Sequence, residues 1–184
     1  MPMDSISLRR INLLHPKIRQ EVLDAYKRVN NNLGAFVQVR ISQTLRTYEE
    51  QEQLYSQGRS ILVGKNGNRL KKVTNAMAGQ SIHNYGLAFD IVLLIDKDRN
   101  DSFESVAWDI KSDYDSDSKA DWIEAATHFK SIGYNWGGDW KSFPDYPHFE
   151  KTYGHTWRTL QQKYRNGDTF TELIDGKIYN WVKL

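Results

Sequence analysis

A chain of 184 residues is long enough to form one catalytic domain with its own hydrophobic core. The absence of cysteine excludes disulfide bonds, a thiol nucleophile and cysteine-based zinc sites. A formal net charge of +2 falls short of a nucleic-acid footprint, and no apolar run approaches a membrane span. We therefore expect neither a nucleic-acid partner nor stable membrane insertion.

The first part of the chain predicts a helix, a strand and a second helix. Pro16 begins the first expected helix, Pro16–Asn31, whose apolar residues recur at helical spacing. Phe36–Ile41 is rich in β-branched residues and predicts a strand. Thr47-Tyr48-Glu49-Glu50 has the pattern of a capping box, so a short helix should follow and end near Gly58. Residues 58–80 are polar and contain glycine, which favours a loop.

The second part begins with Leu87–Ile95, the most apolar run, which predicts a central strand. An acidic, irregular segment follows, and the remaining expected elements are a helix at Ser118–Ile132, a short strand from His148, a helix at Thr156–Arg165 and a hairpin at Phe170–Val182. The order lacks a repeating βαβ pattern. We expect an α+β fold with a small, mainly antiparallel sheet and flanking helices. Residues 1–184 should form a single domain, with 168–184 completing it as a hairpin.

The acidic segment, residues 96–117, raises the question of calcium. Asp96–Asp101 resembles the first half of a calcium loop. However, Asp101 stands where the sixth position needs glycine, and Ala107 at the twelfth position cannot supply a bidentate carboxylate. We interpret this stretch as a solvated loop.

Two distant clusters carry the residues best suited to chemistry. Asp90 lies inside the apolar strand, and a carboxylate there is costly unless it is paired or bound to a metal. His83 precedes it by seven residues, so a bend is needed for the two to meet, and Asn84-Tyr85-Gly86 can supply it. The second cluster contains Asp145 and His148, where flanking prolines disfavour a helix.

Two imidazoles and one carboxylate form a plausible ligand set for catalytic zinc, which uses three protein ligands and leaves one position open. The spacing alone does not identify the site, since most histidines are not metal ligands. The same ligand set also occurs in non-haem iron oxygenases, although those usually place the first two ligands in a His-x-Asp pair.

Four motifs resemble those of one family. Ser81–Asp90 (SIHNYGLAFD) looks like the S-x-H-x-x-G-x-A-x-D signature of zinc D-Ala-D-Ala carboxypeptidases and L-alanyl-D-glutamate endopeptidases. Asp145–Glu150 (DYPHFE) resembles its second signature. Residues 44–59 resemble its upstream arginine motif, and Trp136–Trp140 (WGGDW) is similar to the run found in the endopeptidase branch. Within the family, the likeness is closest to phage endolysins.

The resemblance implies a role for each matched residue. His83, Asp90 and His148 would bind Zn²⁺, and Asp145 would be the general base, at a position where many members carry glutamate. Arg46 would bind substrate or stabilise the oxyanion, unless it forms a surface ion pair with Glu49 or Glu50. Further expected substrate contacts are Ser81 and Trp140. Glu150 is an alternative base or a supporting contact of His148.

The resemblance also implies that the chain cleaves peptidoglycan stem peptides between L-Ala and D-Glu through metal-activated water. The alternatives are a D-Ala-D-Ala carboxypeptidase of the same family and a non-catalytic zinc- or wall-binding module. The N-terminus shows no secretory signal pattern. We therefore expect a monomer that is made in the host cytoplasm and acts on the bacterial cell wall.

Overall fold

The computed structural model describes residues 3–184, which divide into two compact units. The first unit contains residues up to 44 together with residues 88–151. The second contains residues 45–87 and 152–184. Each unit therefore combines two separate stretches of sequence. The prediction that 1–184 form one domain stays a prediction.

The first unit is built on an antiparallel sheet whose central strand is β2 (Ala88–Ile95). One edge of β2 pairs with β1 (Val37–Gln43), from Val37 opposite Ile95 onwards. The other edge is shared by β5 (His148–Glu150), which pairs with the start of β2, and β3 (Ser105–Ala107), which pairs with its end. β4 (Asn135–Trp136) extends the sheet beyond β5. These pairings confirm the expected small antiparallel sheet.

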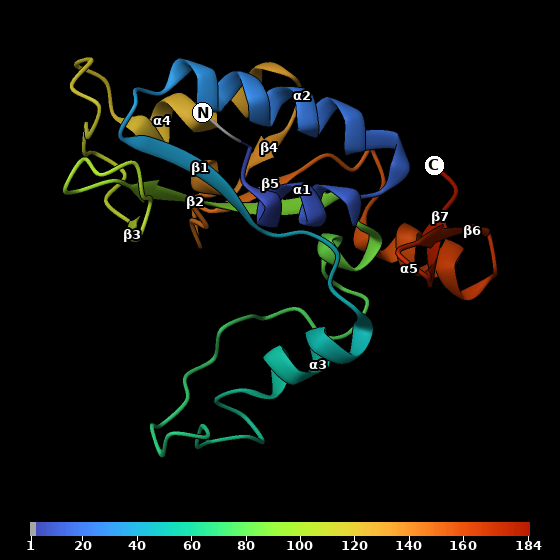
Figure 1. Ribbon diagram of the computed structural model, residues 1–184. Helices are drawn as coiled ribbons and strands as arrows, with labels where there is room; N and C mark the ends of the chain where they lie inside the picture. Colours follow the sequence, from blue (N-terminus) through green and yellow to red (C-terminus); the bar gives the residue numbers. More distant parts are fainter. Residues whose placement is uncertain (1–2) are drawn as a thin grey trace. The chain divides into compact units, whose positions relative to one another are not determined.

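Helices supply the rest of the first unit. α2 (Pro16–Asn32) and α4 (Asp121–Ser131) lie side by side over the sheet, as Figure 1 shows. α1 (Ser5–Asn12) contacts β1 and α2. The core between the helices and the sheet consists of aliphatic and aromatic side chains, and Phe89 of the sheet packs there against Phe129 and Phe149. Burial of this apolar surface stabilises the sheet that carries the candidate site.

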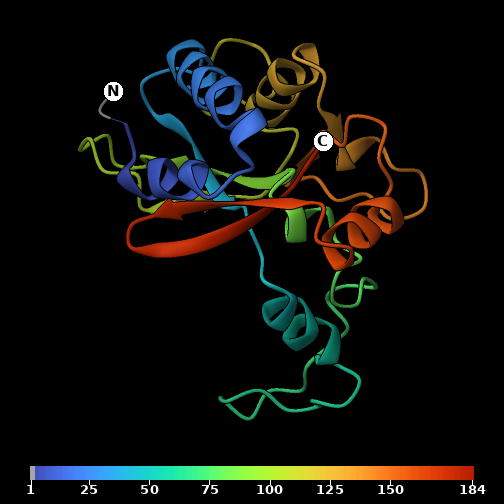
Figure 2. The same cartoon turned by 90° about the vertical axis from the view of Figure 1, so that its right-hand side faces the viewer.

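The second unit contains three helical segments and a hairpin: α3 (Tyr48–Ser56), the 3₁₀ helix η1 (Ile82–Tyr85), α5 (Trp157–Arg165), and the strands β6 (Thr169–Ile174) and β7 (Lys177–Val182). α5 packs against β7, one strand of the hairpin that is drawn in red in Figure 2. The Tyr48 ring lies 5.3 Å from that of Tyr164, which joins the start of α3 to α5. Among residues 3–184, no helix has the length and apolarity needed to cross a membrane.

The observed helices and strands agree with the predicted ones where the local sequence signals are strong. Thr47 and Glu50 form the expected capping box at the start of α3. The predicted C-terminal hairpin is present, and Asp175 and Gly176 at its turn both have positive φ angles. The prediction that the helix at Pro16 is the first one is wrong, because α1 precedes it. The region before β5, for which the sequence predicts neither a helix nor a strand, contains β4 and the 3₁₀ helix η2 (Gly137–Asp139).

Asp4 explains why α1 forms. Its carboxylate caps the helix by accepting hydrogen bonds from the backbone N–H groups of Ile6 and Ser7. It also forms an ion pair with Arg40 of β1, at 2.8 Å between Nε and Oδ2. Burial raises the pKa of Asp4, but the bonds from Arg40 and Ser7 outweigh this effect and hold the pKa below its ordinary value.

We therefore predict that Asp4→Asn lowers stability at pH 7 by about 1 kcal/mol, because asparagine keeps the cap and loses the ion pair. Since the folded-state pKa of Asp4 is lowered, its contribution is present above the unfolded value of 3.8 and is lost as pH falls through the folded value. Urea unfolding at pH 7 and at acidic pH measures this. If the difference in unfolding free energy between wild type and Asp4→Asn is the same at acidic pH as at pH 7, the ion pair of Asp4 does not contribute as proposed.

Candidate metal centre

The pairing of β2 with β5 places Asp90 directly opposite His148. The two residues are 58 positions apart in sequence, and their side chains meet at 3.2 Å between Oδ1 of Asp90 and Nδ1 of His148. β5 begins at His148, as the flanking prolines predicted. The polar residue that disrupts the apolar pattern of β2 is thus paired with an imidazole, which offsets the cost of placing a carboxylate there.

Both ring nitrogens of His148 face carboxylates. Nδ1 faces Asp90, and Nε2 lies 3.0 Å from Oε2 of Glu150. Burial lowers the pKa of His148, but the bonds and charges of Asp90 and Glu150 outweigh it and raise the pKa to about 9. This arrangement favours a cation at the position of the ring, either a proton or a metal ion.

His83 lies in η1, in the bend that the sequence requires. Ser81 precedes this short helix, and Gly86 closes it with a left-handed φ of 67°. Asn84 fixes the segment: its Oδ1 accepts a bond from the N–H of Gly79, and its Nδ2 donates to the carbonyl of Arg46. The carbonyl of His83 accepts the N–H of Arg46. The His83 side chain is buried.

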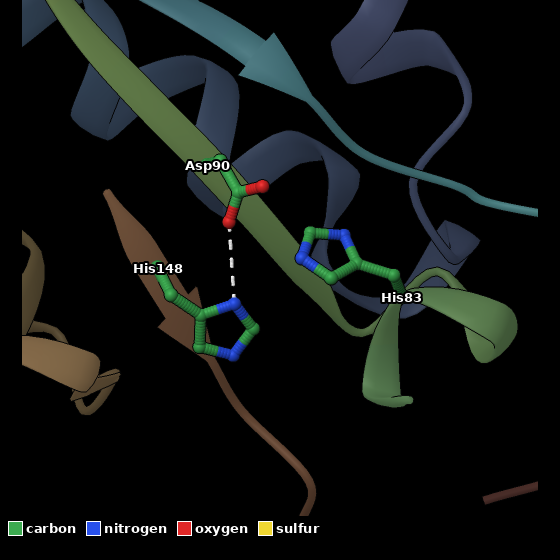
Figure 3. Close-up of side chains that lie close together, drawn as sticks. All are labelled: His83, Asp90 and His148. Atoms are coloured by element: carbon green, nitrogen blue, oxygen red, sulfur yellow. Dashed lines mark hydrogen bonds and ion pairs between the residues drawn. The ribbon is translucent and has the colours of Figure 1, made fainter. Parts of the chain in front are cut away.

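His83, Asp90 and His148 each offer one ligand atom, and these atoms lie within 4.8 Å of one another (Figure 3). Two ligands of a tetrahedral zinc ion at about 2.1 Å from the metal are about 3.4 Å apart. The 3.2 Å between Asp90 and His148 is close to that separation. Two imidazoles and a carboxylate also match the ligand preferences of zinc, so these residues fit the metal.

Gly137 brings the segment of Asp145 close to the turn after β4. The N–H of Asp145 donates to the carbonyl of Gly137 at 2.9 Å, and the N–H of His148 donates to the carbonyl of Asp145 at 3.1 Å. A Cβ atom at Gly137 would lie 2.4 Å from that Asp145 carbonyl oxygen and 3.1 Å from the Cβ of His148. At Gly138 it would meet the ring of Trp136 at 2.4 Å. The WGGDW run therefore needs both glycines for close packing.

The Trp140 ring lies beside His148. Their centroids are 5.3 Å apart, and Trp140 is 39% exposed, so part of its face is open to a ligand. A hollow of about 380 Å³ is lined in part by Trp136, Trp140 and Glu150. The Asp145 side chain is half-buried and does not belong to the group of three ligand atoms.

Arg46 is buried, which distinguishes between its two interpretations. Its Nη1 donates to Oε1 of Gln51 at 2.8 Å, while the carboxylate of Glu50 accepts the N–H of Thr47. A buried arginine that donates to Gln51 does not fit the interpretation as a solvent-exposed surface residue. Gln51 is itself fully buried and donates to the carbonyl of Ala76. No motif or spacing in the sequence indicates this role of Gln51.

Tyr85, two residues after His83, is a buried supporting residue and does not line a substrate groove. The side chain is buried, and its hydroxyl donates to the carbonyl of Gly79 at 2.7 Å. The Tyr48 hydroxyl lies 3.1 Å away. Tyr85 thus holds the loop before η1 rather than facing a ligand.

Comparison with known proteins points in one direction. Residues 74–151, which contain all three candidate ligands, match a peptidase M15 family described as D-alanyl-D-alanine carboxypeptidase. The chain is 42% identical over 137 residues to the peptidoglycan L-alanyl-D-glutamate endopeptidase CwlK of Bacillus subtilis. That match covers 74% of this chain and 72% of the relative.

A solved structure shares the fold. The L-Ala D-Glu endopeptidase ChiX of Serratia marcescens superposes with a TM-score of 0.52 at 21% identity, covering 82% of this chain and 90% of that one. These findings confirm the family resemblance that the four motifs predicted. The chain belongs to the M15 family of peptidases.

Proposed function

We propose that the protein is a zinc-dependent L-alanyl-D-glutamate endopeptidase acting on the stem peptide of peptidoglycan. The observation that carries this proposal is the convergence of His83, Asp90 and His148 within 4.8 Å, in a chain that is 42% identical over 137 residues to a peptidoglycan L-alanyl-D-glutamate endopeptidase. The phage type of the enzyme, its site of synthesis and its monomeric state stay predictions.

His83, Asp90 and His148 would hold the zinc ion. When bound, zinc polarises a carbonyl group and makes water acidic enough to supply hydroxide near neutral pH. Nε2 of His148 lies 3.0 Å from Oε2 of Glu150, so it could donate a hydrogen bond to this carboxylate while the ring binds the metal. This second carboxylate fixes the tautomer and the orientation of the imidazole, as partners of metal-bound histidines commonly do.

Asp145 would act as the general base. It lies three residues before His148, in a segment held by the carbonyl and N–H bonds around Gly137. A carboxylate at this position can accept a proton from the attacking water and deliver it to the leaving amine. Its backbone is fixed while its side chain is half-buried, which suits a group that must reach reacting atoms.

Arg46 and Trp140 would position the substrate, with Ser81 as a further contact at the start of η1. The guanidinium of Arg46 is oriented by Gln51, and it could pair with a stem-peptide carboxylate or with the developing oxyanion. The exposed face of Trp140 beside His148 offers an apolar wall.

A second candidate activity is release of the terminal D-Ala, favoured by the description of the matching family as D-alanyl-D-alanine carboxypeptidase. Both activities would use the same metal ligands and differ in how the substrate lies across them. The products therefore distinguish the two.

Purified zinc-loaded protein incubated with bacterial sacculi should release fragments with new D-Glu amino termini, identified by mass spectrometry and end-group labelling. Release of D-Ala alone would replace the endopeptidase assignment with the carboxypeptidase. Binding to sacculi without any new terminus would instead indicate a non-catalytic wall-binding module.

The metal ligands can be tested by metal content. We expect His83→Ala and His148→Ala to lose stoichiometric zinc, since each removes one of three ligands. His155→Ala is the matched control, because His155 lies in neither motif. Inductively coupled plasma mass spectrometry after dialysis gives the readout. Full zinc retention in either ligand variant, or iron in place of zinc in the wild type, would overturn the assignment.

Asp145→Asn should keep the bound zinc and the melting temperature while kcat falls by about 10²–10⁴-fold, because the amide cannot accept the proton. Asp139→Asn is the control. Asp139 lies in η2, where its carboxylate is 2.6 Å from the Lys130 ammonium. If Asp145→Asn leaves kcat unchanged, the base is another group, and Glu150→Gln becomes the next variant to measure.

A further inference from the structure

The acidic loop that leads into α4 has regularly spaced carboxylates. Residues 113–124 read DYDSDSKADWIE, with Asp at the first, third, fifth and ninth positions and Glu at the twelfth. The twelve-residue calcium loop of helix–loop–helix (EF-hand) sites takes its ligands from positions 1, 3, 5, 7, 9 and 12, and the ligand at position 12 is a bidentate glutamate. This stretch follows residues 96–107, which lack the glycine and the glutamate of a calcium loop.

The structure brings these carboxylates together in two overlapping groups. Ligand atoms of Asp113, Asp115 and Asp121 lie within 4.8 Å of one another, and so do those of Asp115, Asp117 and Glu124. Asp115 belongs to both groups, so the five side chains surround one region of the first unit.

Buried, unpartnered oxygens within this cluster point to a cation. Asp121 is fully buried; its Oδ2 accepts the N–H of Tyr114 at 2.8 Å, while its Oδ1 is buried and has no hydrogen-bond partner. Oε2 of Glu124 is likewise buried and unpartnered. Leaving a carboxylate oxygen buried without a partner is costly. Both atoms belong to residues at the positions that complete a calcium loop.

The charges around Asp121 support the same conclusion. Asp121 lies close to the carboxylates of Asp113 and Asp115, so negative charge is concentrated around a buried side chain. Lys119 brings a positive charge to the cluster, and its ammonium lies 2.7 Å from Asp117 and 3.3 Å from Glu124. The Lys119 side chain is 64% exposed, so it can move into solvent when a divalent ion binds.

The backbone already adopts the required course. Ser118, at the sixth position, has a φ of 75°, the left-handed conformation for which such loops use glycine. Asp113 accepts the N–H groups of Ser116 and Ser118 at 2.6 and 2.9 Å. α4 begins at the ninth position, and its N-cap residue, Ala120, makes no side-chain capping bond.

We propose that residues 113–124 form a calcium-binding loop, with carboxylate ligands from Asp113, Asp115, Asp117, Asp121 and Glu124 and the carbonyl of Lys119. Calcium is favoured over magnesium because it accepts many oxygen ligands in flexible geometry, whereas magnesium demands a compact octahedron. The ion would fix the start of α4. This site is separate from the zinc ligands and does not depend on the peptidase assignment.

The test is calcium titration of the zinc-loaded full chain by isothermal titration calorimetry, with differential scanning calorimetry in calcium or chelator. We expect one calcium ion per chain, a higher melting temperature with calcium, and weak or no response to magnesium. Glu124→Gln should weaken calcium binding by about tenfold or more, because it removes the bidentate ligand.

Asp117→Asn provides a second variant at a solvent-exposed ligand, in case Glu124→Gln alters α4 itself. Asp98→Asn is the matched control, since it removes a carboxylate from the other acidic group, Asp96, Asp98 and Glu104. The proposal is overturned if the wild type binds no calcium at millimolar concentration. It is also overturned if binding is lost in Asp98→Asn and retained in both loop variants.

Discussion

The candidate centre depends on one strand pairing. β2 is apolar along most of its length, and its single carboxylate is tolerated because β5 presents an imidazole directly opposite. Side chains alternate between the faces of a strand, so a shift of one residue would turn Asp90 and His148 to opposite faces. The packing of Phe89 against Phe149, one position along the same pairing, holds the register. Hydrophobic packing therefore sets the geometry of the polar pair.

The surroundings of His148 show how one residue can be prepared for a cation. Its ring lies between two carboxylates, and their combined effect on its pKa exceeds that of burial. Binding a metal ion at the imidazole would replace a proton with another cation in the same carboxylate surroundings. Such an exchange couples metal affinity to proton concentration.

Much of this arrangement could be predicted from the sequence. A lone aspartate in an apolar strand, a bend required before it and prolines that start a strand at His148 are local signals, and each was found as expected. α1 was missed because it is short and its cap depends partly on Arg40, 36 residues away. The burial of Arg46 and its bond to Gln51 also result from tertiary packing, which spacing does not reveal.

The acidic segment, residues 96–117, also shows that the burial of a side chain cannot be predicted from spacing in the sequence. Its aspartates cannot be distinguished by sequence, and the pattern of residues 96–107 indicates only a solvated loop. Burial distinguishes them from Asp121, which follows the segment and is wholly enclosed, whereas Asp98 and Asp101 are exposed. A carboxylate in the first turn of a helix is common because it interacts favourably with the helix dipole. The position of Asp121 in sequence therefore does not by itself indicate a metal ligand.

The two glycines of the WGGDW run divide the loop before β5 into parts with different evolutionary freedom. A side chain at Gly137 would collide with the backbone of Asp145, and one at Gly138 would collide with the indole ring of Trp136. Substitution of either glycine is therefore disfavoured. A few residues later, Lys141, Ser142 and Phe143 face solvent and can change without disturbing Asp145 or His148. Adaptation of this loop to a different wall chemistry would therefore begin at its outward tip.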